Sequence, residues 1–279
     1  MLARNVGTVI LMVVLFAGLG MSLKVQSAGE TIARFSDVRG DDAGAGQLFY
    51  PEHAVYVPGL FDLLGFEVSR DASFVYFDLR FAALTNPFQA PEGYFHQRIE
   101  ILIRTGESPE KTDIPIGSHT LQTGLGLGWN VRLSVAPFDE SRLIVVGADG
   151  QVQVLSEEVI SGILPDNQTI RVQVNSDALP QPDSAWGYYV LVGSFDGLAQ
   201  GSWRDLGDGP WQVGGEGLPV FDLLSPRFGR RSQKNQLSEG VLYPVYASGA
   251  NPVIWLSAAL GVVLVLGVVF IWRWRLGRS

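Results

Sequence analysis

The chain has 279 residues, of which 47% are hydrophobic and only 17% are charged, and it contains no cysteine. Ordinary soluble domains carry about 25% charged residues, so part of this chain is unusually apolar. The absence of cysteine excludes disulfide scaffolds, cysteine-ligated zinc, iron–sulfur clusters and thiol catalysis. A net charge of −8 argues against a nucleic-acid partner, which requires a basic surface.

The first apolar segment, residues 5–23, follows Arg4 and contains no charged residue. Such a segment is typical of a secretory signal, and Val25 and Ser27 supply the small residues that precede a cleavage site. We therefore interpret residues 1–27 as a signal peptide. The alternative is an uncleaved anchor, because this apolar core is long for a signal peptide. Either interpretation sends the following residues across the membrane.

A second apolar segment, residues 253–272, consists of twenty uncharged residues. At about 1.5 Å per residue, a helix of this length spans about 30 Å, the thickness of a bilayer core. Trp255 and Trp272 lie near its two ends, where aromatic anchors occur, and residues 273–279 carry three arginines. The sequence therefore predicts a single-pass cell-membrane protein with an extracytoplasmic ectodomain and a basic cytoplasmic tail at 273–279.

The part between these segments is more acidic than the whole chain. Residues 1–27 and 252–279 hold five basic residues and no acidic ones, which leaves 15 basic and 28 acidic residues and a formal charge of −13. Such a surface repels anionic lipid headgroups and nucleic acid. It suits cations or neutral ligands.

Hydrophobic residues in this middle part alternate with a period of two. In residues 74–81 the alternation places Val75, Phe77, Leu79 and Phe81 on one face, as in a half-buried strand. The other candidate strands are 61–68, 98–104, 129–135, 142–147, 151–155, 169–174 and 186–195. So many short strands predict an antiparallel β-sandwich over residues 28–225.

Two stretches lack this alternation. Residues 157–163 offer the one short helical possibility. Residues 226–252 gain polar residues and are interpreted as a linker between the sandwich and the membrane, with at most a short edge strand near Val241–Val245.

Several motifs of the middle part occur in a fixed order. They are FSDVRGDDAGAGQLFYP at 35–51, VPGLFDLLGFEV at 57–68, LTNPFQAPEGYFHQRIEILI at 84–103, WGYYVLVGSFDG at 186–197 and PVFDLLSP at 219–226. Together they resemble the C-terminal carbohydrate-binding-like domain of glucodextranase, which is also appended to amylopullulanase-type enzymes. That domain belongs to the DOMON-like β-sandwiches, relatives of the family 9 carbohydrate-binding modules. The resemblance covers roughly residues 35–238 and implies a DOMON-like sandwich that binds polysaccharide or cell-envelope glycan.

An acidic, glycine-rich loop precedes the first clear strand and contains Asp37, Asp41 and Asp42. Ca2+ needs several carboxylate and carbonyl oxygens, which such a loop can turn inward, and Asp62 offers a further ligand. The alternative is that Asp41 and Asp42 cap turns by accepting hydrogen bonds from backbone N–H groups. A structural Ca2+ site and turn capping both stay open.

Aromatic residues supply a candidate sugar-binding surface. Trp203 and Trp211 lie in the turn-rich stretch 196–218, where binding residues often occur, and Arg204 adds a polar partner. Tyr50 supplies a further ring. Sugars present apolar C–H faces on which exposed rings can stack. Packing in the core is an equally weighted alternative for the two tryptophans.

Neither a haem site nor a catalytic site is expected. All three methionines lie within residues 1–27, so a His/Met ligand pair cannot form in the ectodomain. The chain has no Gly-x-Ser-x-Gly elbow, His-Glu-x-x-His helix or Walker loop. We therefore predict a membrane-anchored, non-catalytic module for polysaccharide or cell-envelope glycan. The alternative is an accessory subunit of a membrane transporter or extracellular enzyme complex, which binds no sugar itself and has a membrane-protein partner.

Overall fold

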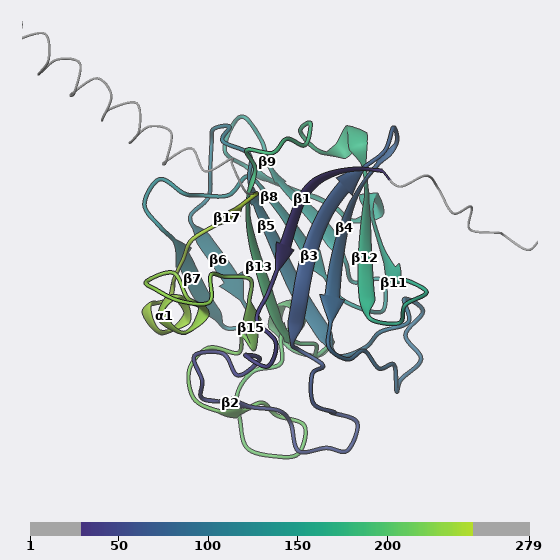
Figure 1. Ribbon diagram of the computed structural model, residues 1–279, viewed down its shortest axis with the longest axis vertical. Coiled ribbons are helices and arrows are strands. Elements are labelled where there is room, and N and C mark those ends of the chain that lie inside the picture. Colours follow the sequence, from purple (N-terminus) through teal and green to yellow (C-terminus); the bar gives the residue numbers. More distant parts are fainter. Residues whose placement is uncertain (1–28, 248–279) are drawn as a thin grey trace, which may run out of the picture.

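The computed structural model describes residues 29–247, whose two large antiparallel sheets pack face to face beside two small sheets (Figure 1). Within this range no helix is long and apolar enough to cross a membrane. The predicted signal peptide and transmembrane helix lie outside the described residues. The observed sheets support the predicted all-β, antiparallel architecture of the ectodomain.

The first sheet has five strands and lies at the front of Figure 1. In spatial order they are β1 (Glu30–Ser36), β3 (Leu63–Arg70), β4 (Phe74–Phe81), β12 (Thr169–Asn175) and β11 (Val159–Ile163). In β4, Val75, Phe77, Leu79 and Phe81 are fully buried while the residues between them are partly or fully exposed. The alternation predicted for residues 74–81 is thus confirmed.

The second sheet has seven strands. Its main path runs through β10 (Val152–Leu155), β9 (Arg142–Val146), β8 (Val131–Val135), β5 (Gln97–Arg104), β13 (Gly187–Ser194) and β15 (Asp222–Leu223), and β17 (Val245–Tyr246) also pairs with β13. Nearly every residue of β5 and β13 is buried, whichever way its side chain points. Continuous apolar runs of this kind are typical of strands covered on both faces.

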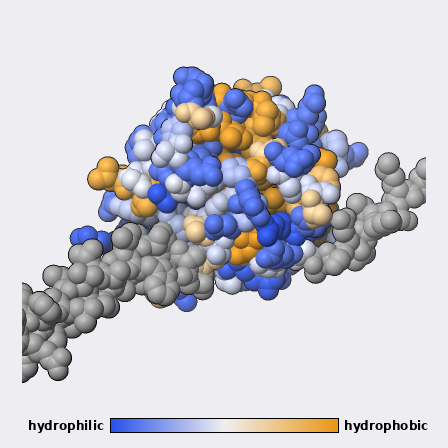
Figure 2. Space-filling view, turned by 90° about the horizontal axis from the view of Figure 1, so that it is seen from above, coloured by the Kyte–Doolittle hydropathy of each residue, from blue (hydrophilic) through white to orange (hydrophobic). Residues whose placement is uncertain are grey.

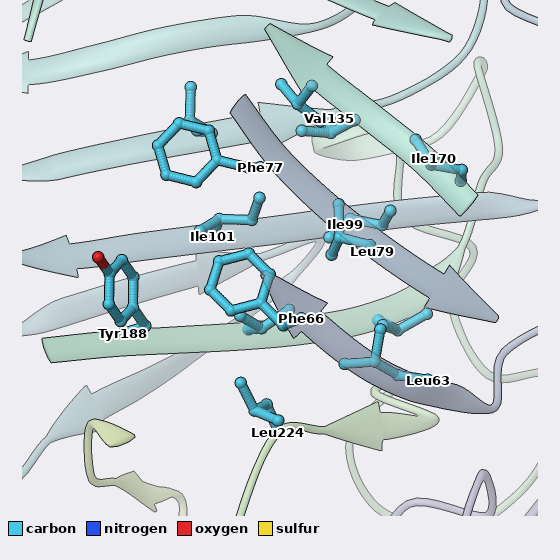
Figure 3. Close-up of a cluster of buried hydrophobic side chains, with 14 of the residues drawn as sticks. Leu63, Phe66, Phe77, Leu79, Ile99, Ile101, Val135, Ile170, Tyr188 and Leu224 are labelled. Atoms are coloured by element: carbon cyan, nitrogen blue, oxygen red, sulfur yellow. The ribbon is translucent and has the colours of Figure 1, made fainter. Parts of the chain in front are cut away.

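The main core fills the space between the sheets (Figure 3). Phe66 and Phe77 of the first sheet lie over Ile99 and Ile101 of the second, and the ring of Tyr188 meets Phe66 edge-on with centroids 5.5 Å apart. Burying a large apolar side chain contributes about 1.5–3 kcal/mol, so this layer holds the sheets together.

A second apolar cluster covers the outer face of the seven-stranded sheet. Its cover consists of β6 (Asp113–Ile116), β7 (His119–Thr123), β16 (Val241–Leu242) and helix α1 (Gln233–Glu239). Leu102 of β5 and Tyr189 of β13 face this cover and contact its buried residues, which include Leu237 and Leu242. The cover explains why β5 and β13 are buried on both sides.

The predicted linker needs correction in the part that the structure describes. Residues 226–247 contain α1, β16 and β17 and pack against the sandwich instead of leading away from it. Helix α1 has the polar sequence QKNQLSE and buries only Gln233, Gln236 and Leu237. It therefore lacks the apolar stripe by which a packed helix is recognised.

The short helical possibility at 157–163 is also wrong. A single 3-10 turn, η1 (Ser156–Glu158), is followed by strand β11. The β-branched residues of VISGI favour extended backbone, and β11 pairs with β12 at the edge of the first sheet. The other 3-10 turns of the described chain are η2 (Ser176–Ala178) and η3 (Gln200–Ser202).

The two ends of the sandwich differ. At the lower end of Figure 1, the connections 37–62 and 195–221 extend beyond the sheets and pair through β2 (Leu48–Phe49) and β14 (Gly214–Gly215). Figure 2 shows the molecule from above, the opposite end, where hydrophobic patches are interspersed with hydrophilic residues. The long connections are therefore concentrated at the end that carries β2, which we call the β2 end.

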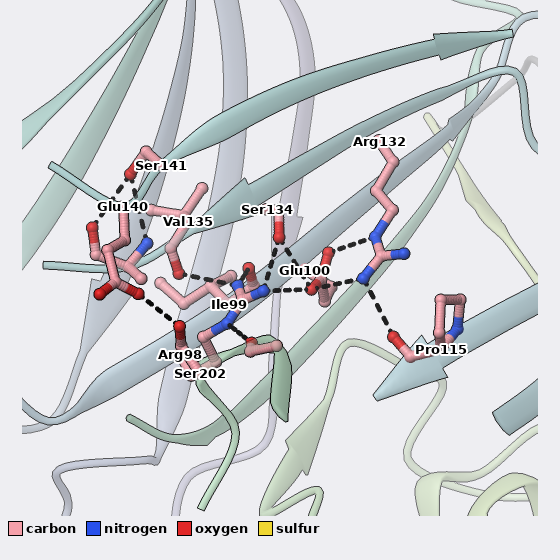
Figure 4. A network of polar contacts seen from close by, with 12 residues as sticks. Arg98, Ile99, Glu100, Pro115, Arg132, Ser134, Val135, Glu140, Ser141 and Ser202 are labelled. Atoms are coloured by element: carbon pink, nitrogen blue, oxygen red, sulfur yellow. Dashed lines mark hydrogen bonds and ion pairs between the residues drawn. The ribbon is translucent and has the colours of Figure 1, made fainter. Parts of the chain in front are cut away.

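A buried ion-pair network lies on the outer face of β5 and β8 (Figure 4). The carboxylate of Glu100 accepts from Arg98 Nη2 at 2.8 Å and from Arg132 Nε at 2.6 Å. Arg98 Nε also donates to the backbone oxygen of Gly201, and Arg132 Nη2 to that of Pro115. The network thereby fixes the covering segments to the sheet.

Candidate functional site

Four aspartates gather at the β2 end. Asp37 follows β1, Asp41 lies in the next loop, Asp62 precedes β3 and Asp222 begins β15. One carboxylate oxygen from each of Asp41, Asp62 and Asp222 lies within 4.8 Å of the others. The fold thus brings together residues that are up to 181 positions apart in the sequence.

Burial governs the electrostatics of these carboxyls. It raises the pKa of Asp37 to about 8 and that of Asp41 to about 6, and the neighbouring carboxylates add to both shifts. Burial also raises the pKa of Asp62 and of the fully buried Asp222. None of the ion pairs found within residues 29–247 includes any of the four. The four carboxyls therefore have no ion-pair partner within residues 29–247, and burial favours their protonated forms.

Backbone groups and one amide hold the cluster in place. Leu63 N and Leu223 N each donate to the carboxylate of Asp222 at 2.7 Å, and Gly40 N donates to Asp62 Oδ1 at 3.0 Å. Gln233 of α1 accepts from Leu223 N and donates to backbone oxygens of the acidic loop. The helix that the sequence assigned to a linker therefore closes this loop.

The donor set fits a hard cation such as Ca2+. Calcium binds oxygen ligands at 2.3–2.6 Å, so two ligands of one ion lie at most about 5 Å apart. Three carboxylates meet this limit. Among the residues described, Oδ2 of Asp37 and Oδ1 of Asp41 are buried without a hydrogen-bond donor. Asp41, Asp62 and Asp222 are therefore the carboxylates that could share a metal ion, and Asp37 lies near enough to interact with them electrostatically.

The predicted ligand set, Asp37, Asp41, Asp42 and Asp62, shares Asp41 and Asp62 with the three carboxylates that converge. Asp37 and Asp42 are not among the three, and Asp42 accepts a hydrogen bond from the hydroxyl of Tyr50. Asp222 is the third converging carboxylate, and sequence reasoning missed it. The one signal for it was its position in the motif PVFDLLSP, where an acidic residue interrupts an apolar run.

The structure separates the two candidate tryptophans. Trp203 is only 1% exposed and packs in the second cluster, so it is not part of an exposed sugar-binding surface. Its ring lies directly over Gly193 of β13, where a Cβ atom would approach Cζ3 to 1.9 Å. Trp211 is 36% exposed and lies on the surface. The core alternative therefore holds for Trp203 alone.

The other two predicted binding residues, Arg204 and Tyr50, hold neighbouring parts of the structure in place. Arg204 is buried, and its guanidinium donates to the backbone oxygen of Trp211 at 2.8 Å and pairs with Asp196 at 2.9 Å. The ring of Tyr50 packs edge-on against Phe61 and Phe221. Arg204 thus positions the backbone of Trp211, and Tyr50 joins the core to the acidic loop.

A row of aromatic rings surrounds Trp211 at the β2 end. The centroid of Phe88 lies 6.2 Å from that of Trp211 and 4.4 Å from that of Phe95, which in turn lies 6.0 Å from Phe138. His53 stacks on Trp211 with ring centroids 3.8 Å apart. We call these five residues the aromatic ledge. Phe88 and Phe138 are 46% and 43% exposed, so the ledge presents three large rings to solvent.

The backbone at one end of the ledge is strained. Phe138 and Asp139 have φ values of 59° and 58°, which non-glycine residues rarely adopt. The carboxylate of Glu92 accepts from both backbone N–H groups, at 3.0 Å and 2.7 Å, and stabilises this conformation. Strain of this kind is frequent at binding sites, where it holds a side chain in a required position. Here it keeps the Phe138 ring at the surface.

Comparison with known protein families places this geometry in context. Residues 32–244 match the family described as the C-terminal binding module, SLH-like, of glucodextranase. The chain belongs to this family. The match covers both sheets except β17 and the first two residues of β1, and it includes the acidic cluster and the aromatic ledge. It confirms the resemblance drawn from the motifs. No curated protein matches the chain at a significant level.

Proposed function

We propose that this protein is a non-catalytic module that binds polysaccharide or cell-envelope glycan through the aromatic ledge. Its family supports a binding role, since its description is that of a binding module of a glucan-degrading enzyme. The observation that carries the proposal is the exposure of Phe88, Phe138 and Trp211 at the β2 end, where Phe95 links the ring of Phe138 to that of Phe88. We take the sandwich to be of the DOMON-like type.

Surface chemistry supports a sugar ligand. Each pyranose ring has an apolar C–H face, and an exposed aromatic ring binds it by contact and by release of water. The ring of His53 stacks on the indole of Trp211 and restricts its movement, and the hydrogen bond from Arg204 holds the backbone of Trp211. A ring that is ordered before binding loses less side-chain entropy when the ligand arrives.

Replacement of Trp211 by alanine is expected to weaken glycan binding about tenfold or more, because central aromatic residues carry much of the energy of such surfaces. The measurement is affinity electrophoresis of the full-length chain in mild detergent against neutral and cell-envelope polysaccharides. Phe228→Ala is the control: Phe228 is 79% exposed, and among the described residues no aromatic ring contacts it. A wild-type chain that binds no polysaccharide of the panel overturns the proposed function.

We further propose that residues 253–272 anchor the module in the cell membrane. The argument is the length and apolarity of this stretch and the arginines that follow it. The full-length chain should remain in the membrane pellet after alkaline carbonate washing, while a chain ending at residue 250 should be released if the signal segment is cleaved. Retention of the shortened chain would assign the anchor to residues 5–23.

A structural Ca2+ ion at the acidic cluster is the remaining part of the proposal. Convergence of Asp41, Asp62 and Asp222 and the raised pKa of each support it. An ion there would join the loop after β1, the start of β3 and β15, and so stabilise the β2 end on which the ledge lies.

A further inference from the structure

A second surface feature lies at the turn 207–212, which also carries Trp211 of the aromatic ledge. It is a hollow of about 360 Å3 between the pair β2–β14 and that turn. Its lining includes Phe49, Glu52, Asp208 and Gln212, together with three glycines. Glu52 directly precedes His53 of the ledge, and Gln212 directly follows Trp211. The hollow and the ledge are therefore built on the same two segments of the chain.

The chemistry of the hollow combines one exposed ring with free polar groups. Phe49 is 67% exposed. Within the described part of the chain, the side chains of Glu52, Asp208 and Gln212 form no hydrogen bond or ion pair. A primary amide offers donors and an acceptor, and carboxylates accept hydrogen bonds from hydroxyl groups. A ring beside unpaired carboxylate and amide groups matches the two sides of a sugar, its C–H face and its hydroxyls.

The backbone around the hollow is fixed in shape. Gly214 pairs with Phe49 across β2 and β14. Gly215 has a φ of 102°, and a Cβ atom there would approach the backbone oxygen of Gln47 to 1.9 Å. His53 N donates to the backbone oxygen of Pro210 at 2.9 Å, which ties the turn to the first long connection. Both walls of the hollow are thus held without support from a ligand.

The charge of the hollow selects among sugars. Two carboxylate side chains, those of Glu52 and Asp208, line it and are exposed, and no basic residue is among its lining residues. Like charges placed together at an interface cost binding energy and reject the wrong partner. An acidic sugar would bring its carboxylate or sulfate against these two groups, whereas a neutral sugar would place hydroxyl donors there.

We propose that this hollow is a subsite for a neutral sugar residue of the polysaccharide and that Glu52 and Asp208 exclude acidic sugars from it. The inference rests on the proposed glycan-binding function. The ledge supplies apolar stacking for the sugars of the polysaccharide, and the hollow recognises hydroxyl groups of one sugar of that polymer. Selectivity for uncharged polymers therefore resides in the hollow and not in the ledge.

The test uses polymers that share a backbone and differ in charge. The probes are the neutral polysaccharide bound best by the wild-type chain, or dextran, and the carboxymethylated form of the same polymer. The full-length wild type should bind the carboxymethylated form about tenfold more weakly than the neutral form. Glu52→Gln combined with Asp208→Asn should largely remove this difference. Phe49→Ala and Gln212→Ala should weaken binding of the neutral polymer.

The matched control is Glu157→Gln combined with Asp177→Asn, which removes the same charge from exposed positions that do not line the hollow. Its ratio of neutral to acidic binding should equal that of the wild type. An unchanged ratio in the Glu52/Asp208 double variant, with binding still dependent on Trp211, overturns the subsite and leaves the ledge standing. Loss of the charge preference in the control as well would show that the overall negative charge of the protein causes the preference, and would also overturn the subsite.

Discussion

Replacing Glu100 by glutamine is expected to lower the free energy of unfolding by about 3–5 kcal/mol, since it removes one partner from a buried ion pair. Glu100 is fully buried between Arg98 and Arg132, whose side chains are 5% and 11% exposed. Burial alone would raise the pKa of Glu100, but the two guanidinium groups outweigh it and lower that pKa. The carboxylate is thus the charged partner on which both arginines depend.

Glutamine keeps the volume and one oxygen of the side chain. The expected loss in the free energy of unfolding therefore comes from the removal of the negative charge. Without the carboxylate, the two buried guanidinium groups lose the counter-charge that they share. For a domain of this size, about 2–4 °C of melting temperature corresponds to 1 kcal/mol, so the melting temperature should fall by about 6–20 °C. Urea unfolding of the full-length chain followed by tryptophan fluorescence gives the free energy directly.

Glu67→Gln is the control for Glu100. Glu67 pairs with Arg34 at 2.9 Å, but that arginine is 69% exposed. Surface pairs contribute about 0–1 kcal/mol, so this variant should unfold almost as the wild type does. Equal stability of the two variants would contradict the assignment of the network as a structural support for the covering segments.

Local patterns in the sequence predict most of the sandwich, because the alternation of apolar and polar residues within a strand shows which of its faces is buried. Residues 74–81 alternate because one face of β4 meets the core and the other meets solvent. Helix α1 could not be predicted in this way, because two of its three buried residues are glutamines, whose amide groups make the contacts. Gln233 binds the acidic loop through hydrogen bonds, and hydrogen-bonded burial leaves no apolar periodicity in the sequence.

The candidate sites were predictable only in part, because they depend on contacts between residues far apart in the sequence. The acidic loop supplied three predicted metal ligands, but contacts with distant residues decide which carboxylates converge, as Asp42 and Asp222 show. Trp203 and Trp211 have similar local surroundings in the sequence. What separates them is the bare surface of β13 at Gly193, which receives the ring of Trp203.

Addition of Ca2+ to the chelated protein is expected to raise the melting temperature by about 5–11 °C at pH 8. A ligand present at 100 times its dissociation constant stabilises by about 2.7 kcal/mol, and each kcal/mol corresponds to about 2–4 °C in a domain of this size. The effect requires ionised carboxylates, because protons and the metal compete for the same oxygens. Differential scanning fluorimetry with EDTA or with saturating CaCl2 measures it.

The dependence on pH follows from the raised pKa values. The ordinary pKa of an aspartate is 3.8, whereas Asp41 has a pKa of about 6 and Asp37 of about 8 in the folded protein. The folded chain therefore holds protons that the unfolded chain has released, and this favours the folded state at low pH. In EDTA, that stabilisation is lost as the pH rises from about 4 to about 8. With Ca2+ bound, this loss of stability should be smaller, because the ion neutralises the carboxylates that have released their protons.

Asp222→Asn separates metal binding from a general effect of calcium. Asparagine keeps only one of the two oxygens that accept from Leu63 N and Leu223 N, and it removes one fully buried carboxylate. The loss of one buried hydrogen bond changes the melting temperature of the variant in EDTA, so the variant's own melting temperature in EDTA at pH 8 is its reference. Relative to that reference, the variant should show no response to CaCl2. Asp149→Asn, in the exposed turn between β9 and β10, should keep the full response. A wild type whose melting temperature does not differ between EDTA and CaCl2 would leave Asp41 and its neighbours with structural hydrogen bonds alone.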